Sequence, residues 1–491
     1  MARRLNLSRL TGLPAEIARP TYEVSAVRSG IVHLGAGAFH RAHQAIYTDD
    51  LLNAGGDSRW GITAVSMRRP DVAEALSDQQ GLYTVTEYDP DGGQALRVIG
   101  AIRGSLVLAA APGEVARAIA RPETRVVSLT VTEKAYHRRD GEQVLDLDAA
   151  PVRSDLACSE PRETAVGALV AGLARRRAEQ AGALTVVCCD NLPENGQVLR
   201  RLCCDFAEAW RPGLAGWIAD HVAFPSSMVD RITPATTPGL LAEVSVALGC
   251  EDRVPIACET FRQWVIEDEF AAGRPPWDLG GAQFVRDVRP FESMKLRMLN
   301  ASHSALAYLG LLAGKACVHE ALAVPQFRAF IERTMTRELA PTVNGVPASE
   351  LAAYRTALLR RFGSPRPAHR LAQIAEDGSQ KIPIRVLKPL RQQLTAGQAS
   401  DGLTLIVAAW LAFQQRIAGG ELPGLLKDPQ TDRLLGAAAI PRASERVRQL
   451  EWVFGPELLA NAAFLERLDA WQLRLATDGP VAAAGAASAG V

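Results

Sequence analysis

The sequence has no excess of either charge and no long apolar run. Among its 491 residues, Lys+Arg and Asp+Glu each number 54, so the formal net charge is zero. This balance gives no reason to expect nucleic acid or an anionic membrane surface as a partner. The least polar long stretch, residues 298–314, includes Asn300 and His303 and is too short and too polar to span a bilayer. It is better interpreted as a buried helix.

The cysteines show no metal-binding pattern, and the N-terminus shows no secretory signal. The eight cysteines include no Cys-x-x-Cys pair, and neither their spacing nor flanking histidines fit a zinc site, so we expect no metal. In a chain of this length they are typical of scattered thiols in a reducing compartment. The basic start, Met1-Ala2-Arg3-Arg4, is not followed by the apolar run of a secretory signal. These features predict a cytoplasmic protein.

The first half of the chain alternates short apolar runs with helical stretches. Four runs rich in β-branched residues stand at 31–34, 61–67, 125–132 and 184–189. Runs that are apolar on both faces, with helices between them, are typical of a parallel sheet covered by helices. Residues 82–88 and 96–102 flank an Asp-Pro-Asp-Gly-Gly turn and predict a hairpin added to this sheet.

The second half is different, because the β-branched runs stop near residue 290. Apolar residues recur there at helical spacing through 293–314, 323–338, 348–362, 383–396, 401–418 and 444–475. We therefore predict an α/β protein with a sheet domain over residues 1–288 and a mostly α-helical domain over residues 289–478. The Ala/Gly-rich residues 479–491 are expected to be disordered.

A glycine-rich segment, Gly35-Ala36-Gly37-Ala38-Phe39-His40, follows the first predicted strand. A helix is expected after it, from residue 41 to residue 53. Strand, glycine turn and helix are the context of a dinucleotide-binding loop, because glycine permits the tight turn and the helix N-terminus attracts the pyrophosphate. His40 stands where the common pattern has a third glycine. The alternative is an ordinary strand–helix turn.

The second predicted strand leads into Arg68 and Arg69. An acidic residue at this place usually holds the ribose hydroxyls of NAD. The two arginines could stack on adenine or bind a 2′-phosphate, and they could equally be surface residues. The choice between NAD and NADP is therefore left open by these residues.

Residues 291–303 place four polar side chains in one sector of a predicted helix. At about 100° per residue, Glu292, Asn300 and His303 fall on the same side as Lys295. Leucines share this sector, so the lysine would be partly desolvated, which lowers its pKa toward neutrality and suits a general base. The alternative is a surface lysine paired with Glu292 and a structural histidine.

A second polar group, Asp190-Asn191, ends the fourth predicted strand. Ligands of open α/β sheets bind outside the carboxyl ends of the strands. Two amides, from Asn191 and Asn300, together with Lys295 could stabilise an alkoxide and remove its proton. A turn or a helix cap is the alternative for Asp190-Asn191. None of the seven tyrosines has a lysine four residues later, which argues against the usual base of short-chain dehydrogenases.

Several motifs, in order, resemble those of the polyol-specific long-chain dehydrogenases. Lys295, Asn300 and His303 match the family's Lys-x-x-x-x-Asn-x-x-His signature. Further matching stretches lie at 31–45, 128–136, 189–196, 224–232, 259–270, 281–292 and 376–385, and the resemblance covers nearly the whole chain except its extreme ends. The resemblance implies a Rossmann-type, doubly wound N-terminal domain with added strands, a helical C-terminal domain, and metal-independent hydride transfer, usually with NAD.

The resemblance also implies residue roles. Lys295 would be the general base, with Asn191 and Asn300 as the oxyanion hole. His303 would position the substrate, and Glu292 would couple the proton of the lysine to solvent.

Further residues enter through the same motifs. Asp230 and Lys381 fall in stretches that line the substrate or cofactor site. The loop of residues 35–40 matches the family's own form, so the missing third glycine is expected. Arg68 and Arg69 depart from the acidic residues of strictly NAD-specific members.

Within the family, residues 263–270, 294–300 and 377–385 look closest to the fructuronate reductase branch. The resemblance therefore implies a small-molecule substrate, D-mannonate or D-fructuronate, whose carboxylate needs a fixed cation: Arg385, Lys381 or Arg370. Mannitol 2-dehydrogenase, acting on D-mannitol or D-fructose, and arabinitol dehydrogenase are the alternatives. The alternative from another class of protein is a nucleotide-binding regulator without catalysis. The presence of Lys295, Asn300, His303 and Asn191 together argues against it, because a regulator would not need that set. We expect a monomer.

Overall fold

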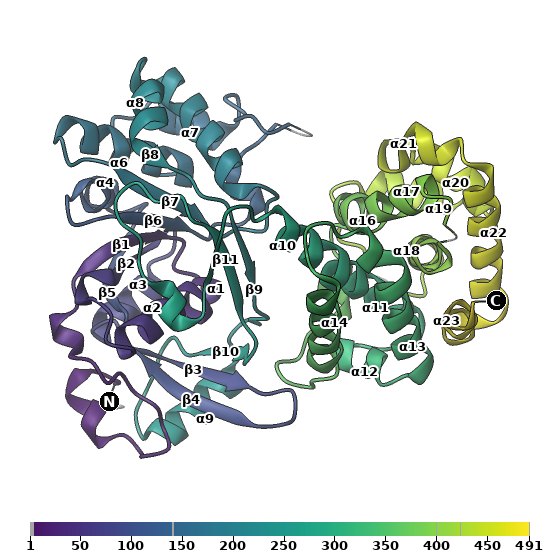
Figure 1. Cartoon of the computed structure of the whole chain (residues 1–491), viewed down its shortest axis with the longest axis horizontal. Helices are drawn as coiled ribbons and strands as arrows, with labels where there is room; N and C mark the ends of the chain where they lie inside the picture. The colour runs from purple at the N-terminus through teal and green to yellow at the C-terminus, as the bar shows by residue number, and fades with distance from the viewer. Residues whose placement is uncertain (1–3, 140–141, 399, 423, 491) are drawn as a thin grey trace. The chain divides into compact units, whose positions relative to one another are not determined.

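The computed structural model describes residues 4–139, 142–398, 400–422 and 424–490. The chain divides into two compact units: unit 1 runs to Asp89 and from Gly93 to Arg289, and unit 2 takes Pro90–Gly92 and the chain from Pro290 (Figure 1). The domain boundary expected at 288/289 thus lies one residue before the observed division. The first three residues of the basic start and the last residue of the Ala/Gly-rich tail lie outside the described residues.

Unit 1 is built on a six-stranded sheet with the strand order β5-β2-β1-β6-β7-β8, and every pairing in it is parallel. The strands are β1 (Ser29–Leu34), β2 (Gly61–Ser66), β5 (Ile102–Val107), β6 (Val126–Leu129), β7 (Leu184–Cys188) and β8 (Val222–Ala223). The chain runs outward from β1 to one edge and then returns to β6 on the other side. The strand order therefore reverses between β1 and β6, which is where ligands of such sheets bind.

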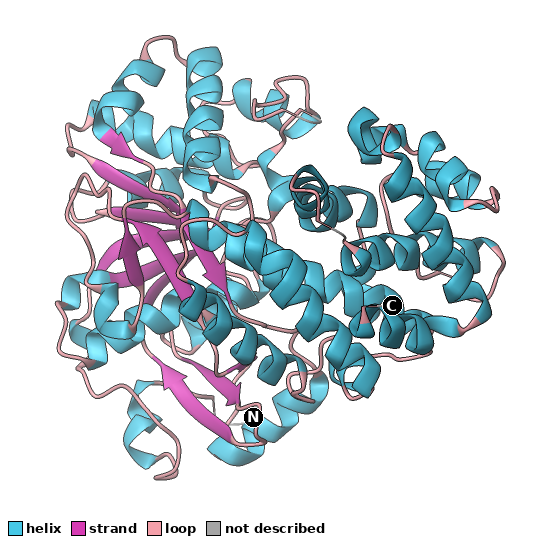
Figure 2. Ribbon diagram, turned by 45° about the vertical axis from the view of Figure 1, so that its right-hand side comes forward, coloured by secondary structure: helices cyan, strands magenta, loops and turns pink. Residues whose placement is uncertain are grey.

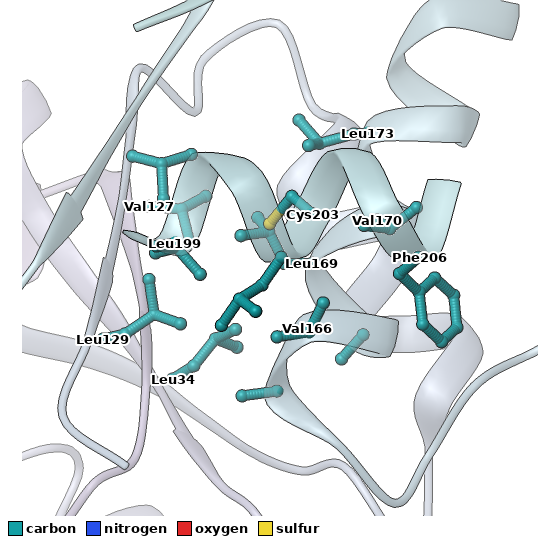
Figure 3. Close-up of a cluster of buried hydrophobic side chains, with 14 of the residues drawn as sticks. Leu34, Val127, Leu129, Val166, Leu169, Val170, Leu173, Leu199, Cys203 and Phe206 are labelled. Carbon is teal, nitrogen blue, oxygen red and sulfur yellow. The ribbon is translucent and has the colours of Figure 1, made fainter. Parts of the chain in front are cut away.

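Helices cover both faces of this sheet. The two faces separate along β1, because successive side chains of a strand point to opposite sides. Val32 and Leu34 enter one hydrophobic cluster, while Ile31 enters another. Figure 3 shows the first cluster, in which Leu34 and its neighbours on β6 face α6 (Ala165–Ala178) and α7 (Asn195–Trp210). The second cluster is closed by α2 (Gln44–Asn53) and α3 (Asp71–Asp78). The predicted doubly wound fold is confirmed.

The predicted hairpin forms, but it is not added to the main sheet. β3 (Tyr83–Tyr88) and β4 (Gln94–Ile99) pair antiparallel, and β3 also pairs with β10 (Ile256–Glu259) in a separate sheet ordered β10-β3-β4. The prediction of an addition was wrong because β5 follows β4 directly and occupies the edge of the main sheet beside β2. A third sheet has the order β12-β11-β9, from β9 (Ser227–Asp230), β11 (Gln263–Glu267) and β12 (Gln283–Val285).

From Pro290 on, the described part of unit 2 consists of helices joined by loops, and the named strands, magenta in Figure 2, all precede residue 290. Its central helix, α11 (Ala301–Leu312), is buried at every position, as expected for a helix surrounded by others. It contacts α13 (Pro325–Thr334), α15 (Leu371–Ala375) and α18 (Asp401–Ala418). The predicted helical second half is confirmed.

The Ala/Gly-rich tail is ordered, which corrects the prediction of disorder. Residues Gly479–Ala489 form α23, with a proline in its first turn. The side chains of Ala483, Ala484 and Ala487 are buried, and the helix contacts α13 and α22 (Ala462–Thr477). Small side chains let a helix approach its neighbours closely, so a composition typical of flexible tails here serves packing.

Candidate active site

The glycine loop lies at the carboxyl end of β1, beside the point where the strand order reverses. Gly35 has a φ of +100°, and a Cβ there would lie 2.0 Å from the carbonyl oxygen of Thr130. Only glycine fits such a position. The amides of Gly35 and Ala36 donate to the carbonyl of Val65 on β2 at 2.9 and 3.0 Å. The loop is thereby fixed between three strand ends, at the place where a dinucleotide-binding turn is required.

The last residue of the loop faces inward. His40 belongs to the short helix α1 (Ala38–Ala42), is fully buried, and stacks on His33 of β1 with ring centroids 3.4 Å apart. Burial lowers the pKa of His40 well below its usual range and that of His33 to about 3, so both rings are neutral. His40 therefore fills the space between helix and sheet that a third glycine would leave. Gly37 is exposed, and Ala38 and Phe39 are half-buried.

Arg68 and Arg69 are both exposed, just beyond the end of β2. The charge of Arg68 helps to lower the pKa of His137, after the larger effect of burial. Arg68 is therefore near enough to His137 to act on it electrostatically, and the role of the two arginines toward a cofactor remains a prediction.

Asp190 fastens the end of β7 to the loop after β6. Its carboxylate accepts hydrogen bonds from the amides of Val131 and Thr132, at 3.0 and 2.9 Å, and from the hydroxyl of Tyr136 at 2.7 Å. Thr132 has a φ of +76°, which non-glycine residues rarely adopt. Burial raises the pKa of Asp190, while these three donors oppose the rise. Asp190 is a structural anchor, and the exposed Asn191 follows it directly.

Asn195 was not singled out from the sequence, yet it holds this strand end. Its amide nitrogen donates to the carbonyls of Asp190 and Ser227 at 2.9 and 2.8 Å, and its amide oxygen accepts from the amide of Ser227 at 2.9 Å. The fully buried side chain thus joins β7 to β9. Its position in the motif 189–196 was the available signal, but the motif alone does not separate a binding residue from a supporting one.

Asp230, a predicted substrate residue, ends β9 and is buried. The next residue, Arg231, holds the strand end from several sides. Its guanidinium donates to the carbonyl of Glu259 at 2.9 Å and to that of Ala42 at 2.7 Å, and it forms an ion pair with Glu87. Arg231 therefore ties β9, β10, β3 and α1 together and fixes the backbone that carries Asp230.

In unit 2, the predicted catalytic helix contains a π-helical segment. α10 (Arg289–Met294) passes into η6 (Lys295–Asn300), which is π-helical, and then into α11. Such segments bond i to i+5 and are frequent at functional sites. The angular spacing of an α-helix, assumed from the sequence, therefore does not apply between Lys295 and Asn300. Glu292 and Lys295 are buried, with 9% and 7% exposed, and Asn300 is half-buried.

His303 lies on α11 among aromatic and cationic side chains. Its ring centroid is 4.7 Å from that of Phe362 and 4.8 Å from that of His369. Burial lowers the pKa of His303 well below its usual range, and His369, Arg385, Arg361 and Lys295 lower it further. Lys295 and His303, predicted to act together, are thus close enough to interact electrostatically.

The three cations considered for a carboxylate have different surroundings. Arg385, on the π-helical segment η9 (Pro383–Leu387), donates to the hydroxyl of Ser304 at 3.4 Å, next to His303. Lys381 donates its Nζ to the carbonyl of Ile374 at 3.3 Å. Arg370 is exposed and bridges through its backbone to Cys317. The structure thus brings Arg385 to His303 and leaves Arg370 at the surface.

Within the described ranges, no group of three or more His, Cys, Asp or Glu side chains could hold a metal ion. In the same ranges, no helix combines the length and the hydropathy needed to cross a bilayer.

A doubly wound nucleotide-binding fold followed by a helical unit with a lysine-bearing helix defines a class of dehydrogenases. Comparison with protein families places the chain within this class. The mannitol dehydrogenase Rossmann domain matches residues 29–279, and the mannitol dehydrogenase C-terminal domain matches residues 287–472. The chain belongs to the mannitol dehydrogenase family of oxidoreductases, which confirms the resemblance read from the motifs.

Individual relatives match over nearly the full chain. D-mannonate oxidoreductase of Escherichia coli (strain K12) is 42% identical over 94% of this chain and 96% of its own length. Mannitol 2-dehydrogenase of Phaeosphaeria nodorum is 38% identical over 94% of this chain and 81% of its own length. Among solved structures, the Pseudomonas fluorescens mannitol 2-dehydrogenase ternary complex with NAD and D-mannitol has a TM-score of 0.86 at 35% identity, covering 98% of both chains.

Proposed function

We propose that the protein interconverts D-fructuronate and D-mannonate, by metal-independent hydride transfer with a nicotinamide cofactor and with Lys295 as general base. The observation that carries the proposal is the basic surrounding of His303: Arg385 donates to the hydroxyl of the neighbouring Ser304 at 3.4 Å, and Arg361 and Lys295 also act on the ring of His303 electrostatically. Such a surrounding suits a substrate with a carboxylate. The 42% identity to D-mannonate oxidoreductase of Escherichia coli supports the same substrate.

Unit 1 would hold the cofactor, and NAD is the first candidate because the related mannitol 2-dehydrogenase was solved with NAD. The loop fits this role, since Gly35 cannot carry a side chain and Gly37, at the start of α1, is exposed. When bound, the nicotinamide accepts or donates the hydride. NADP is the alternative that Arg68 and Arg69 suggest.

Lys295 would act on the proton. In the oxidation direction its Nζ would accept the proton of the substrate hydroxyl. Glu292, one turn earlier, would pass this proton toward solvent, and His303 would orient the substrate. The predicted amide donors belong to different units, Asn191 to unit 1 and Asn300 to unit 2. Their joint role as an oxyanion hole stays a prediction, as do the substrate roles of Asp230 and Lys381.

The test is a reductase assay with purified protein, comparing D-fructuronate with D-fructose, each with NADH and with NADPH. We expect D-fructuronate to have the higher kcat/KM. A preference for D-fructose would instead make the protein a mannitol 2-dehydrogenase, which the ternary complex with D-mannitol favours as the second candidate. No turnover of any polyol or sugar acid would point to a nucleotide-binding regulator. We also propose a monomer located in the cytoplasm, which gel filtration and cell fractionation would test.

A double variant tests the choice between NAD and NADP. Replacing both Arg68 and Arg69 with serine should leave the KM for NADH nearly unchanged and raise the KM for NADPH about tenfold, since each arginine can make charge-assisted bonds to a 2′-phosphate. Equal changes in the KM values for NADH and NADPH would show that the arginines do not distinguish the two cofactors by the 2′-phosphate.

A further inference from the structure

Two imidazoles meet in unit 2. His303 projects from α11, and His369 lies just before α15 begins at Leu371. Their rings are 4.8 Å apart and nearly perpendicular, at 87°. His303 is more than nine-tenths buried, with 6% exposed, whereas His369 is half-buried. The pair therefore extends from the interior of the helical unit toward its surface.

Each imidazole has a buried nitrogen to which the described part of the chain supplies no hydrogen-bond partner. These atoms are Nε2 of His303 and Nδ1 of His369. Buried polar atoms are nearly always bonded in folded proteins, and an exception needs an explanation such as a ligand. Two such atoms on touching rings indicate that a ligand with hydrogen-bonding oxygens belongs here.

The charges around the pair indicate the sign of this ligand. After burial, the groups that lower the pKa of His303 most are His369, Arg385, Arg361 and Lys295. Burial and Arg361 also lower the pKa of His369, to about 4. Both rings are therefore neutral at pH 7, and each can donate an N–H. Guanidinium groups near neutral N–H donors suit an anion, and carboxylate is the anion that guanidinium geometry matches well.

The groups come together from four places in the sequence. Arg361 and Phe362 end α14 (Ala348–Phe362), and Phe362 packs against the ring of His303. Arg385 reaches the same end of α11 from η9, where it donates to Ser304. Among the cations considered from the sequence, only Arg385 is placed here, while His369 and Arg361 were not considered at all.

We propose that His369 and Arg361 complete, with His303 and Arg385, a subsite for the carboxylate of an open-chain sugar acid. His369 and Arg361 are then specificity-determining residues that favour sugar acids over neutral polyols. The inference rests on the proposed function, because it assigns the carboxylate end of the substrate to these residues.

The test replaces His369 with leucine, which removes both nitrogens, and with glutamine, which keeps an N–H donor. Steady-state kinetics with NADH would be measured for D-fructuronate and for D-fructose. We expect His369→Leu to raise the KM for D-fructuronate about tenfold or more, as for a lost hydrogen bond to a charged group, with less change for D-fructose. His369→Gln should restore part of the difference. Thermal unfolding would verify that both variants fold.

A control is His221→Leu, the same change at an exposed histidine that ends α8 (Leu214–His221) in unit 1, which should leave both KM values unchanged. Arg361→Lys, which keeps the charge but not the planar fork, should raise the KM for D-fructuronate selectively. If His369→Leu alters both substrates equally or neither, the subsite is wrong while the proposed function stands. If the unmodified protein does not reduce D-fructuronate, the proposed function itself fails.

Discussion

The hydroxyl of Tyr136 donates to the carboxylate of Asp190 at 2.7 Å and lies 3.0 Å from the sulfur of Cys188. This contact joins the short helix after β6 to the end of β7. Together with the bonds from Val131 and Thr132, it fixes the two loops that flank the sequence-predicted Asn191. The Asp190–Tyr136 contact therefore helps to hold the loops at the carboxyl edge of the main sheet in place.

Replacing Asp190 with alanine should destabilise the protein, because the buried hydroxyl of Tyr136 and the amides of Val131 and Thr132 would lose their acceptor. We expect a loss of about 1–3 kcal/mol in the free energy of unfolding, measured by urea denaturation. Tyr136→Phe should cost less, since Asp190 keeps its two amide donors. A Tyr136→Phe variant less stable than Asp190→Ala would contradict this account.

Lys295→Ala should lose catalysis by several orders of magnitude. The expected reason is that no other group would take the hydroxyl proton of the substrate. Binding of NADH, measured by fluorescence, should persist because the predicted cofactor loop, residues 35–40, belongs to unit 1. As a control, Lys315→Ala changes a half-buried lysine after α11 and should keep full activity. Near-normal turnover of Lys295→Ala would refute the assignment of the base.

Stability should depend on pH through Glu338 in unit 2. Its carboxylate accepts from the amides of Gly402 and Leu403, both at 2.8 Å, at the start of α18. Burial raises the pKa of Glu338 to about 7, from 4.5. The folded state thus holds a proton that the unfolded state releases between these values, so stability is full below pH 4.5 and falls as the pH rises toward 7.

By linkage, the contribution of Glu338 to this fall is at most about 3 kcal/mol. Unfolding of Glu338→Gln, followed between pH 5 and 8, should show a flatter curve than the unmodified protein. Parallel curves for the two proteins would mean that Glu338 keeps its ordinary pKa in the folded state.

The C-terminal helix should contribute to stability. Ala483 on α23 is fully buried, so Ala483→Glu would place a charge in a packed interface and should lower the unfolding temperature by several degrees. Ala482→Glu, one residue earlier at an exposed position, should have little effect. Equal unfolding temperatures for the two variants would restore the prediction of a disordered tail.

Much of the fold followed from local pattern. The four apolar runs became β1, β2, β6 and β7, and Gly35 marked the turn where only glycine fits. Two predictions failed for identifiable reasons. The hairpin of β3 and β4 was assigned to the wrong sheet because alternation does not specify which strand becomes the neighbour. The tail was taken for disordered because alanine and glycine serve equally in flexible segments and in tightly packed helices.

In the candidate site, too, some residues could be predicted from the sequence and others only from the structure. Lys295, Asn300 and His303 lie close in sequence on one helix, so their spacing revealed them, although the π-helical segment changed their geometry. His369 and Arg361 were not predicted, since no sequence pattern distinguishes either from an ordinary surface residue. Only their position beside His303 indicates a role.

The sequence by itself determined the two-part α/β and helical architecture, the family, and the polar set of the predicted catalytic helix, because each depends on local periodicity or on a short motif. Only the tertiary structure decided the strand pairing of the added sheets, the support of Asn191 by Asp190 and Asn195, and the gathering of Arg361, His369 and Arg385 around His303. These features depend on contacts between residues far apart in the chain, which are fixed by the packing of whole elements and leave no local pattern.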